Sequence, residues 1–428
     1  MILGQKILLY PTPEQALVFN KSFGVKRYAY NWALSEWKKQ KANGVKTVKM
    51  NDLKKEWNKV KPEWVYDCPK DANQQPFADV STALKNYFEA KKNGNKHFKF
   101  PRKKHKGKSK DSFYVSNDQA HITNNHIKLP LIGRVRLAEG LRFKKKHTRI
   151  LSFTVSRTAD KYYVSVNYEI PDALGATQSG SGMVGIDLGL KTFAVESNGH
   201  EEQSPRPLKK HQHKLVRLQR KLSRATKGSI RRNKTKMKLA KQHARITNIR
   251  KDHLHKYSRK VVNANAIIVL EDLNVNGLLK NHKLARSIAD SSWSELIRMI
   301  TYKSKRSGSI VLKADRWFSS SKLCSECGAL KPKLGLDERE YICEECGCIK
   351  DRDHNASINI LAHGLFQLIP SASGKFTSVE IVALAQRAIA ELTMVSETFL
   401  RSEKGQWNSA SLVDALRNKV TLFTTKQP

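Results

Sequence analysis

Four cysteines in two closely spaced pairs constrain the fold of this chain more than any other feature of its sequence. Cys324 and Cys327 form one Cys-x-x-Cys pair, and Cys343 and Cys346 form a second pair after fifteen intervening residues. Two residues between thiolates let one tight turn direct both at the same metal, and a glycine follows each pair. Four thiolates fill a tetrahedral Zn²⁺ and leave no open position. We therefore expect one structural zinc ion, held by a zinc ribbon over residues 323–349.

The context of these cysteines favours metal over disulfide chemistry. No run of the sequence approaches the ~18 apolar residues of a membrane-spanning helix, and the N-terminus lacks a basic segment followed by an apolar one. In a chain without a secretion signal, paired cysteines indicate metal binding. Cys348 could replace Cys346 as the fourth ligand at the cost of the spacing, whereas Cys68 stands alone. We expect a cytoplasmic protein with no membrane partner.

The charge of the chain predicts a polyanionic partner. There are 79 Lys and Arg residues against 38 Asp and Glu residues, a formal net charge of +41. Such an excess destabilises a compact state by self-repulsion unless a polyanion neutralises it. Nucleic acid is the first candidate, because phosphate contacts also release condensed counterions, and an acidic membrane surface is the rival.

Two segments concentrate this positive charge. Residues 90–110 carry ten Lys and Arg residues and no acid, with aromatic side chains interleaved, which favours phosphate contact with some base or sugar stacking over a plain exposed loop. Residues 206–260 carry 21 basic residues and one acid, and their apolar spacing predicts two helices along a nucleic-acid groove. The candidate nucleic-acid-binding residues in these segments are Phe98, Arg102, Lys103, Lys104, Arg217, Arg220, Lys221, Arg224, Arg231 and Arg232.

Changes in hydrophobic period divide the chain into several parts. Ile2 to Tyr10 is predicted to be a strand, and the spacing from Glu14 to Ala90 is helical. Period-two alternation over residues 112–168 indicates a small antiparallel barrel or sheet, and a linker rich in Pro, Gly and Ser follows over residues 171–182. Apolar strands then return at 183–188, 266–270 and 309–313. The pattern is typical of a multidomain α+β protein.

Three acids occupy positions where an isolated charge would be costly. Asp187 and Glu271 lie at the ends of apolar strands, and Asp353 lies at the expected start of a helix that follows the second cysteine pair. A buried carboxylate costs several kcal/mol unless a cation compensates it. Taken singly, each acid is a helix cap, a strand-end acid or a salt-bridge partner. Together they predict a site for Mg²⁺, which prefers carboxylate oxygens.

These residues fall within an ordered set of motifs that resembles the TnpB family of insertion-sequence proteins, which are related to the compact type V CRISPR effectors. The resemblance extends to about residue 362. Its motifs are Tyr10-Pro-Thr-Pro-Glu-Gln15, Phe23-Gly-Val-Lys-Arg27-Tyr-Ala-Tyr-Asn31, Phe98-Lys-Phe-Pro-Arg102, Gly185-Ile-Asp187-Leu-Gly189, Ile268-Val-Leu-Glu271-Asp-Leu, Ser287-Ile-Ala-Asp-Ser-Ser-Trp293, Ala314-Asp-Arg-Trp-Phe318-Ser-Ser-Ser-Lys-Leu-Cys324-Ser-Glu-Cys-Gly328 and Asp351-Arg-Asp353-His-Asn355-Ala-Ser-Ile-Asn-Ile360.

The resemblance implies a fold and an activity. It implies an RNase H-like (RuvC) α/β nuclease domain over 183–322 and 350–370, and the inserted zinc ribbon would bind target nucleic acid. A β-barrel wedge domain would comprise 1–14 and 111–182, with a helical recognition domain inserted over 15–110. The C-terminal tail over 371–428 is poorly matched by the family and would be disordered or dispensable. Family members are RNA-guided DNA endonucleases that use a guide RNA transcribed from the transposon end and require a short motif beside the target.

The resemblance also implies roles for individual residues. Asp187, Glu271 and Asp353 fall on the three RuvC acids, which would hold two catalytic Mg²⁺ ions. The residues that recognise the target-adjacent motif would lie near Lys70, Gln74, Ser116 and Asn117. We expect a monomeric protein in a ribonucleoprotein with guide RNA and double-stranded target DNA, acting on the nucleoid of a prokaryotic cytoplasm.

Three alternatives remain at this stage. A nuclease-dead RNA-guided repressor would bind the target without cleaving it, although such proteins usually lack one of the acids. A strand transferase would need a nucleophilic tyrosine with a paired-histidine metal motif, and the one close pair is His211-Gln-His213, in the basic segment. A zinc-ribbon transcription factor would explain the cysteines and the charge but not the acids on apolar strands.

Overall fold

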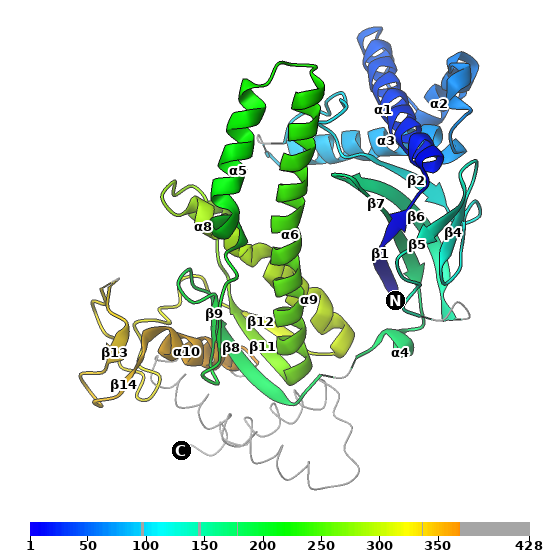
Figure 1. The fold of residues 1–428 in the computed structure, drawn as a ribbon. Helices are drawn as coiled ribbons and strands as arrows, with labels where there is room; N and C mark the ends of the chain where they lie inside the picture. The colour runs from blue at the N-terminus through cyan, green and yellow to red at the C-terminus, as the bar shows by residue number, and fades with distance from the viewer. Residues whose placement is uncertain (96–97, 144–146, 178, 336, 369–428) are drawn as a thin grey trace. The chain divides into compact units, whose positions relative to one another are not determined.

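The computed structural model describes residues 1–95, 98–143, 147–177, 179–335 and 337–368 (Figure 1). It divides into two compact units. Unit 1 contains residues 1–175 and 225–244, and unit 2 contains residues 176–224 together with the described residues from 245 onward. The tail expected over 371–428 lies outside the described residues.

Unit 1 contains a seven-stranded sheet in the order β2-β6-β7-β1-β5-β4-β3. The N-terminal strand therefore lies inside the sheet, where it pairs antiparallel with β7 and β5. The described pairings place β2 and β3 at the two ends of this order, which agrees with the antiparallel sheet that the period-two pattern allows, and the barrel that the resemblance implies stays a prediction. The strands are β1 (Ile2–Tyr10), β2 (Ser112–Ser116), β3 (His121–Ile122), β4 (His126–Leu129), β5 (Gly133–Leu137), β6 (Arg149–Thr158) and β7 (Lys161–Glu169).

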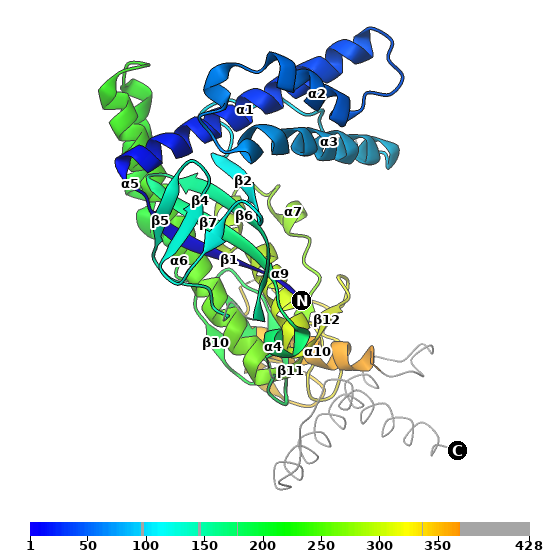
Figure 2. The same cartoon turned by 90° about the vertical axis from the view of Figure 1, so that its right-hand side faces the viewer.

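Helices between β1 and β2 pack together in the same unit (Figure 2). The first begins sharply because Thr12 and Gln15 form a capping box around Pro13. Trp57 is fully buried, and its ring lies 5.2 Å from that of Trp32 and 6.3 Å from that of Phe77. The helices of this unit are α1 (Pro13–Ala42), α2 (Met50–Val60), the 3₁₀ turn Glu63–Val65, α3 (Lys70–Lys92) and the short α4 (Asp172–Gly175).

Unit 2 contains a five-stranded mixed sheet in the order β10-β9-β8-β11-β12. Strands β8, β11 and β12 run parallel, and β9 is antiparallel to β8. Strand β11 is buried along almost its whole length, as expected for a parallel strand covered on both faces. The strands are β8 (Gly182–Asp187), β9 (Ala194–Glu196), β10 (Glu201–Glu202), β11 (Asn265–Glu271) and β12 (Ile310–Ala314).

Alternate residues of β11 enter two different cores. Ile268 and Leu270 pack with side chains of α6 and α9, whereas Ile267 and Val269 pack with α10. The sheet is thus covered by helices on both faces. The helices are α5 (Pro207–Arg224), α6 (Ile230–Ala264), α7 (Val275–Leu278), α8 (Ala285–Ser291), α9 (Trp293–Ser307) and α10 (Arg352–Phe366), and residues 225–244 of the chain belong to unit 1.

Helix α10 lies unusually close to the sheet because two glycines face the contact. A Cβ atom on Gly185 of β8 would lie 2.2 Å from the backbone oxygen of Ser357, and one on Gly364 would lie 2.4 Å from a methyl group of Val269. The strand that ends at Asp187 and the helix that begins beside Asp353 therefore meet backbone to backbone.

None of the described helices combines the length and the apolar character that a membrane span requires.

Candidate functional site

Two of the predicted acids end neighbouring parallel strands. Ile186 of β8 lies opposite Leu270 of β11, so Asp187 and Glu271 follow at the same carboxyl edge of the sheet. Ligand sites of α/β sheets form outside the carboxyl ends of parallel strands. Both side chains are half-buried.

The third acid approaches this edge from α10. Asp351 caps that helix, because one of its carboxylate oxygens accepts hydrogen bonds from the backbone N–H groups of Asp353 and His354, each at 2.9 Å. The cap occupies Asp351 and places Asp353 in the first turn, on a helix that packs against both β8 and β11. Arg339 approaches the Asp353 carboxylate at 3.9 Å.

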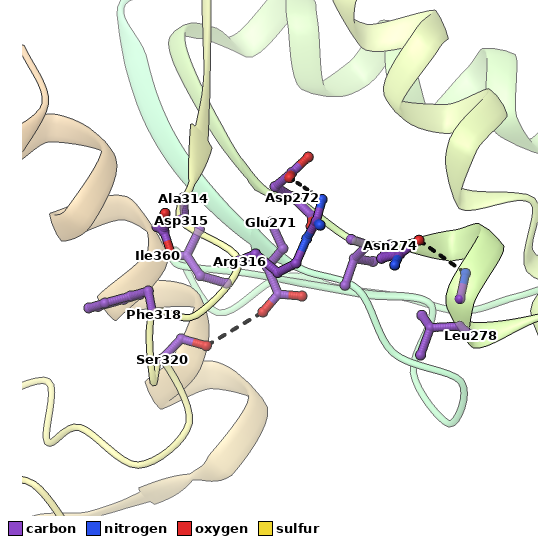
Figure 3. A pocket seen from close by; sticks show the side chains of 12 residues that line it. Glu271, Asp272, Asn274, Leu278, Ala314, Asp315, Arg316, Phe318, Ser320 and Ile360 are labelled. Carbon is purple, nitrogen blue, oxygen red and sulfur yellow. Dashed lines mark hydrogen bonds and ion pairs between the residues drawn. The ribbon is translucent and has the colours of Figure 1, made fainter. Parts of the chain in front are cut away.

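The three carboxylates affect one another electrostatically. Burial raises the pKa of Asp187 well above its usual range, and the charges of Glu271 and Asp353 raise it further, against a smaller opposing effect of Arg352. Burial also raises the pKa of Glu271, whereas a hydrogen bond from Ser320 opposes that rise. The Ser320 hydroxyl lies 3.5 Å from a Glu271 oxygen (Figure 3). Carboxylates that are costly to ionise together are suited to a divalent cation.

The acids are more widely spaced than the ligands of a single ion. Among the described residues, the cysteine cluster is the one group of three or more His, Cys, Asp or Glu ligands whose donor atoms all lie within 4.8 Å of one another. Two-metal sites separate their ions by about 3.5–4 Å, so acids that bind different ions need not meet that limit. Carboxylate oxygens are the donors that Mg²⁺ prefers, although the described acids do not form a single-ion cluster of this kind.

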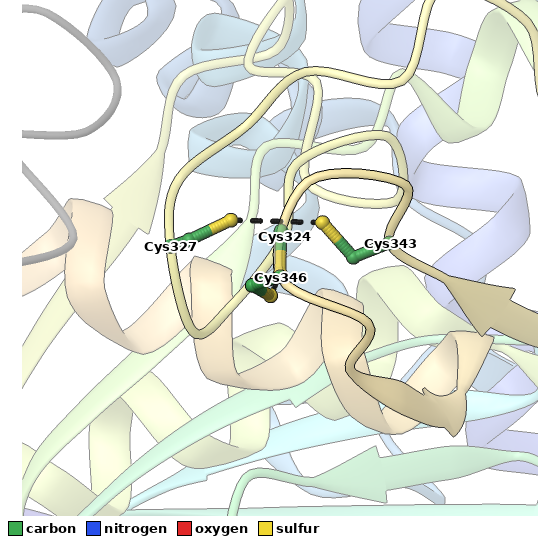
Figure 4. A group of neighbouring side chains, drawn as sticks. All are labelled: Cys324, Cys327, Cys343 and Cys346. Atoms are coloured by element: carbon green, nitrogen blue, oxygen red, sulfur yellow. Dashed lines mark hydrogen bonds between the residues drawn. The ribbon is translucent and has the colours of Figure 1, made fainter.

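The four predicted zinc ligands do meet around one point (Figure 4). The sulfur atoms of Cys324 and Cys346 lie 3.7 Å apart, and those of Cys327 and Cys343 lie 3.6 Å apart. Four thiolates about 2.3 Å from a tetrahedral Zn²⁺ would be separated by about 3.8 Å. The cluster therefore fits zinc, and neither Cys348 nor Cys68 belongs to it.

The two cysteine turns repeat the same local geometry. Gly328 and Gly347 adopt φ values of 75° and 70°, and their N–H groups donate to the carbonyls of Cys324 and Cys343, each at 3.0 Å. Although burial opposes ionisation of Cys343, hydrogen bonds from the backbone of Cys346 and Glu345 lower the pKa of this thiol to about 7. Two antiparallel strands flank the second turn. β13 (Glu340–Ile342) ends just before it, and β14 (Ile349–Asp351) begins shortly after it.

Two buried asparagines of α10 connect this cluster to the acids. Asn355 accepts a hydrogen bond from the Ser325 N–H at 2.9 Å and donates to the Leu323 carbonyl at 2.7 Å, so it holds the backbone on both sides of Cys324. Asn359 donates to the carbonyls of Ser320 and Leu323, at 2.8 and 2.7 Å. One helix thus fixes both the first cysteine turn and the serine that contacts Glu271. The sequence analysis overlooked this pair, which could have been found from two asparagines spaced i, i+4 on an otherwise apolar helix face.

A pocket of about 320 Å³ opens beside Glu271 (Figure 3). The turn after β12 supplies Asp315, Arg316, Phe318 and Ser320 to its wall. The opposite wall comes from the segment after β11, including Asp272, Leu273, Asn274 and Leu278. None of these neighbours of Glu271 was selected from the sequence.

In unit 1, the structure brings together four of the predicted nucleic-acid contacts. Lys70 and Gln74 lie in the first turns of α3, and Ser116 and Asn117 lie at the end of β2. Asp71 joins the two elements, because its carboxylate accepts hydrogen bonds from the N–H and the hydroxyl of Ser116 at 2.7 and 2.8 Å.

The first basic segment contains exposed and packed residues. Phe98, Arg102 and Lys103 are exposed. Lys104 instead lies 3.7 Å from the centre of the Tyr30 ring, and burial followed by the charge of Lys26 lowers its pKa. Of these four residues, Lys104 is the one whose side chain packs against another part of the protein.

The second basic segment also separates by environment. Arg217, Arg220, Lys221 and Arg224 of α5 are all exposed, as helical spacing away from the buried Leu215 and Leu218 requires. Arg231 is exposed as well, whereas Arg232 donates to the Ala225 carbonyl at 2.8 Å.

Three family models match parts of the chain. A model described as a probable transposase of the OrfB_IS605 type matches residues 165–282, and a Cas12f1-like TNB domain model matches residues 293–360. A model described as a helix-turn-helix domain of the same OrfB_IS605 type matches residues 1–46. In this structure those residues form β1 and the single long helix α1.

Similar proteins extend over most of the chain. A protein from Streptomyces pristinaespiralis named "Putative RNA-guided DNA endonuclease" is 36% identical, covering 84% of this chain and 89% of that protein. "Putative RNA-guided DNA endonuclease InsQ" from Escherichia coli (strain K12) is 32% identical, covering 84% and 91%. "TnpB-like protein L79" from Acanthamoeba polyphaga mimivirus is 32% identical over 42% of this chain and 37% of that protein.

Solved structures were compared as well. One titled "Cryo-EM structure of the Cas12f1-sgRNA-target DNA complex" aligns with a TM-score of 0.32 at 14% identity, covering 84% of this chain and 99% of that chain. One titled "Structure of the mini-RNA-guided endonuclease CRISPR-Cas_phi3" aligns with a TM-score of 0.43 at 10% identity, covering 84% and 92%. Because both TM-scores are low, the functional argument rests on the sequence relatives.

Proposed function

The chain belongs to the TnpB family, and from that membership we propose that it is an RNA-guided DNA endonuclease whose catalytic acids are Asp187, Glu271 and Asp353. One observation carries the proposal: three carboxylates from distant segments approach the carboxyl edge of one sheet, and the charges of two of them raise the pKa of the third. Relatives named for this activity support the same assignment.

The three acids would hold two Mg²⁺ ions. Bound there, the ions would supply an activated water and stabilise the leaving 3′ oxygen of a phosphodiester. The chain's own contribution is positional. The two strand ends fix Asp187 and Glu271, the Asp351 cap fixes Asp353, and Ser320 restrains Glu271 by its hydrogen bond.

The positive charge would serve the nucleic acid. A formal charge of +41, with exposed Arg and Lys residues along α5, suits a guide RNA and a DNA target. We propose that the guide derives from the transposon end and that base pairing selects the target. The group joined by Asp71, which contains Lys70, Gln74, Ser116 and Asn117, is our proposed reader of a target-adjacent motif, and the zinc ribbon is proposed to contact the target.

The test is plasmid cleavage by the protein purified with its own transposon-end RNA. We expect Mg²⁺-dependent cutting of a plasmid library that contains the target, and none after Asp187→Ala. Glu201→Gln is the matched control, because this exposed acid lies on β10 of the same sheet. Cutting that survives Asp187→Ala would exclude this site as the nuclease centre. Target binding without cutting by the unaltered protein would instead indicate an RNA-guided repressor.

A further inference from the structure

Trp317 is the most exposed large apolar side chain in the described part of the chain, at 86%. Tryptophan is ordinarily well buried in folded proteins, since its large ring gains most from leaving water. Trp317 is therefore available to a binding partner, on the segment whose flanking residues Arg316 and Phe318 line the pocket beside Glu271.

The chain around Trp317 is ordered by short-range hydrogen bonds. The backbone N–H of Trp317 donates to the Asp315 carboxylate at 2.8 Å, and the backbone N–H of Phe318 donates to the Asp315 carbonyl at 3.1 Å. The turn continues to Ser320, whose hydroxyl meets Glu271. Trp317 is thus three residues from a direct contact of a proposed catalytic acid.

The neighbours of Trp317 line the pocket beside Glu271 (Figure 3). Arg316 and Phe318 both contribute to it, together with the apolar side chains of Leu278 and Ile360. The Phe318 ring is supported from behind by His363, with their ring centres 4.3 Å apart. The pocket therefore offers a braced aromatic and apolar wall.

The charges at this pocket argue against a phosphate as its occupant. Three acids line the pocket, Glu271, Asp272 and Asp315, against one basic residue, Arg316. Arg316 is already paired with Asp272 at 2.6 Å, and Lys313 contacts the same acid at 2.8 Å without lining the pocket. The balance leaves no surplus positive charge for an anion. An uncharged planar ring that stacks on aromatic side chains suits this lining better.

We infer that this pocket and Trp317 form a subsite for one nucleobase of the DNA strand being cut, with the indole as the stacking surface. The inference rests on the proposed function and identifies how that site would hold its substrate. Only a base free of its duplex could enter, and stacking tolerates any base, as a guide-directed nuclease requires. A base held in this subsite would position the neighbouring phosphodiester beside the three proposed catalytic acids.

The experiment uses the full-length protein with its guide RNA and a target in which 2-aminopurine replaces successive bases of each strand. Ca²⁺ replaces Mg²⁺ so that the DNA stays intact. We expect a fluorescence change at one position that Trp317→Ala abolishes and Trp317→Phe keeps. In Mg²⁺, Trp317→Ala should slow cleavage between about fivefold and about a hundredfold, the worth of one stacked base, with target affinity unchanged. Ile2→Ala, at a 67% exposed apolar position of β1 in unit 1, is the matched control.

The outcomes separate the subsite from the nuclease assignment. Cleavage by Trp317→Ala at the unaltered rate, or a 2-aminopurine signal that this variant retains, would overturn the subsite while leaving the nuclease intact. A fall in target affinity equal to the fall in rate would also overturn it, because Trp317 would then contact the guide or the duplex. Failure of the unaltered complex to cut any target would refute the proposed function, whereas the fluorescence arm would still test the subsite.

Discussion

Asn355→Ala tests how strongly α10 supports the zinc cluster. The side chain is fully buried and makes two hydrogen bonds to the backbone on either side of Cys324. Each such bond contributes about 1 kcal/mol, and the buried N–H of Ser325 would lose its partner at a further cost of about 1–3 kcal/mol. The Leu323 carbonyl keeps its bond from Asn359. Alanine's better helix propensity offsets about 0.5 kcal/mol, which leaves a loss of about 2.5–4.5 kcal/mol.

The zinc affinity should report this loss. A free energy of about 2.5–4.5 kcal/mol corresponds to about 70- to 2000-fold in zinc affinity if it acts on the metal-bound state alone. Part of this free energy is also lost from the metal-free protein, which reduces the effect on zinc binding. Residues that orient metal ligands typically contribute about 10–100-fold to metal affinity. We therefore expect zinc to be released to a chromogenic chelator at a concentration at least tenfold lower than for the unaltered protein. Asn233→Ala, an exposed helical asparagine, is the control. A lower melting temperature with unchanged zinc affinity would refute the reasoning.

Three further predictions follow from the same unit. Replacing Cys343 by Ser should remove zinc, as measured by metal analysis, and should lower Mg²⁺-dependent cleavage although no proposed catalytic acid is changed; full activity without zinc would contradict this. For Asp187→Asn we expect no cleavage and a higher melting temperature of the metal-free protein at neutral pH. The folded-state pKa of Asp187 lies above its usual value of 3.8, so the folded protein binds more protons than the unfolded chain. Its stability therefore falls as the pH rises from 3.8 to the folded-state pKa. Melting curves across this range should show the fall in the unaltered protein and a smaller one in the variant. Gly185→Ala should destabilise the protein by about 1–3 kcal/mol or more in denaturant titration, because its Cβ would meet backbone atoms of α10 at 2.2 and 2.6 Å. Gly44→Ala is the comparison. That residue has open space around it and a φ of +81°, so this substitution reports backbone strain without a steric clash.

The sequence predicted the zinc cluster well because its information is local. The spacing of Cys324 and Cys327 and the glycine after them specify one turn, and the second pair repeats it. The ligand set follows from chemistry alone, and the structure places all four sulfur atoms around one point. The strands that end at Asp187 and Glu271 were also predictable, since each is a short apolar run that ends in an acid.

The surroundings of the acids could not be predicted in the same way. Ser320 and the two asparagines act through contacts between segments that are thirty or more residues apart, as in the bond from Asn355 to Leu323, and a single sequence shows no pattern for such pairs. Asp71 was missed because its role depends on α3 meeting β2. The sequence predicted Lys104 to contact nucleic acid, whereas its contact with Tyr30 arises only when α1 folds beside it.

The contact of Gly185 with the backbone of α10 has a consequence for how the acids are kept in register. Where large side chains separate a helix from a sheet, each change in side-chain volume alters the distance between the helix and the sheet. Here main-chain atoms set the closest approach, so the offset between Asp187 and Asp353 is a property of the polypeptide itself. The apolar layers on either side can exchange one hydrocarbon for another while that offset stays the same.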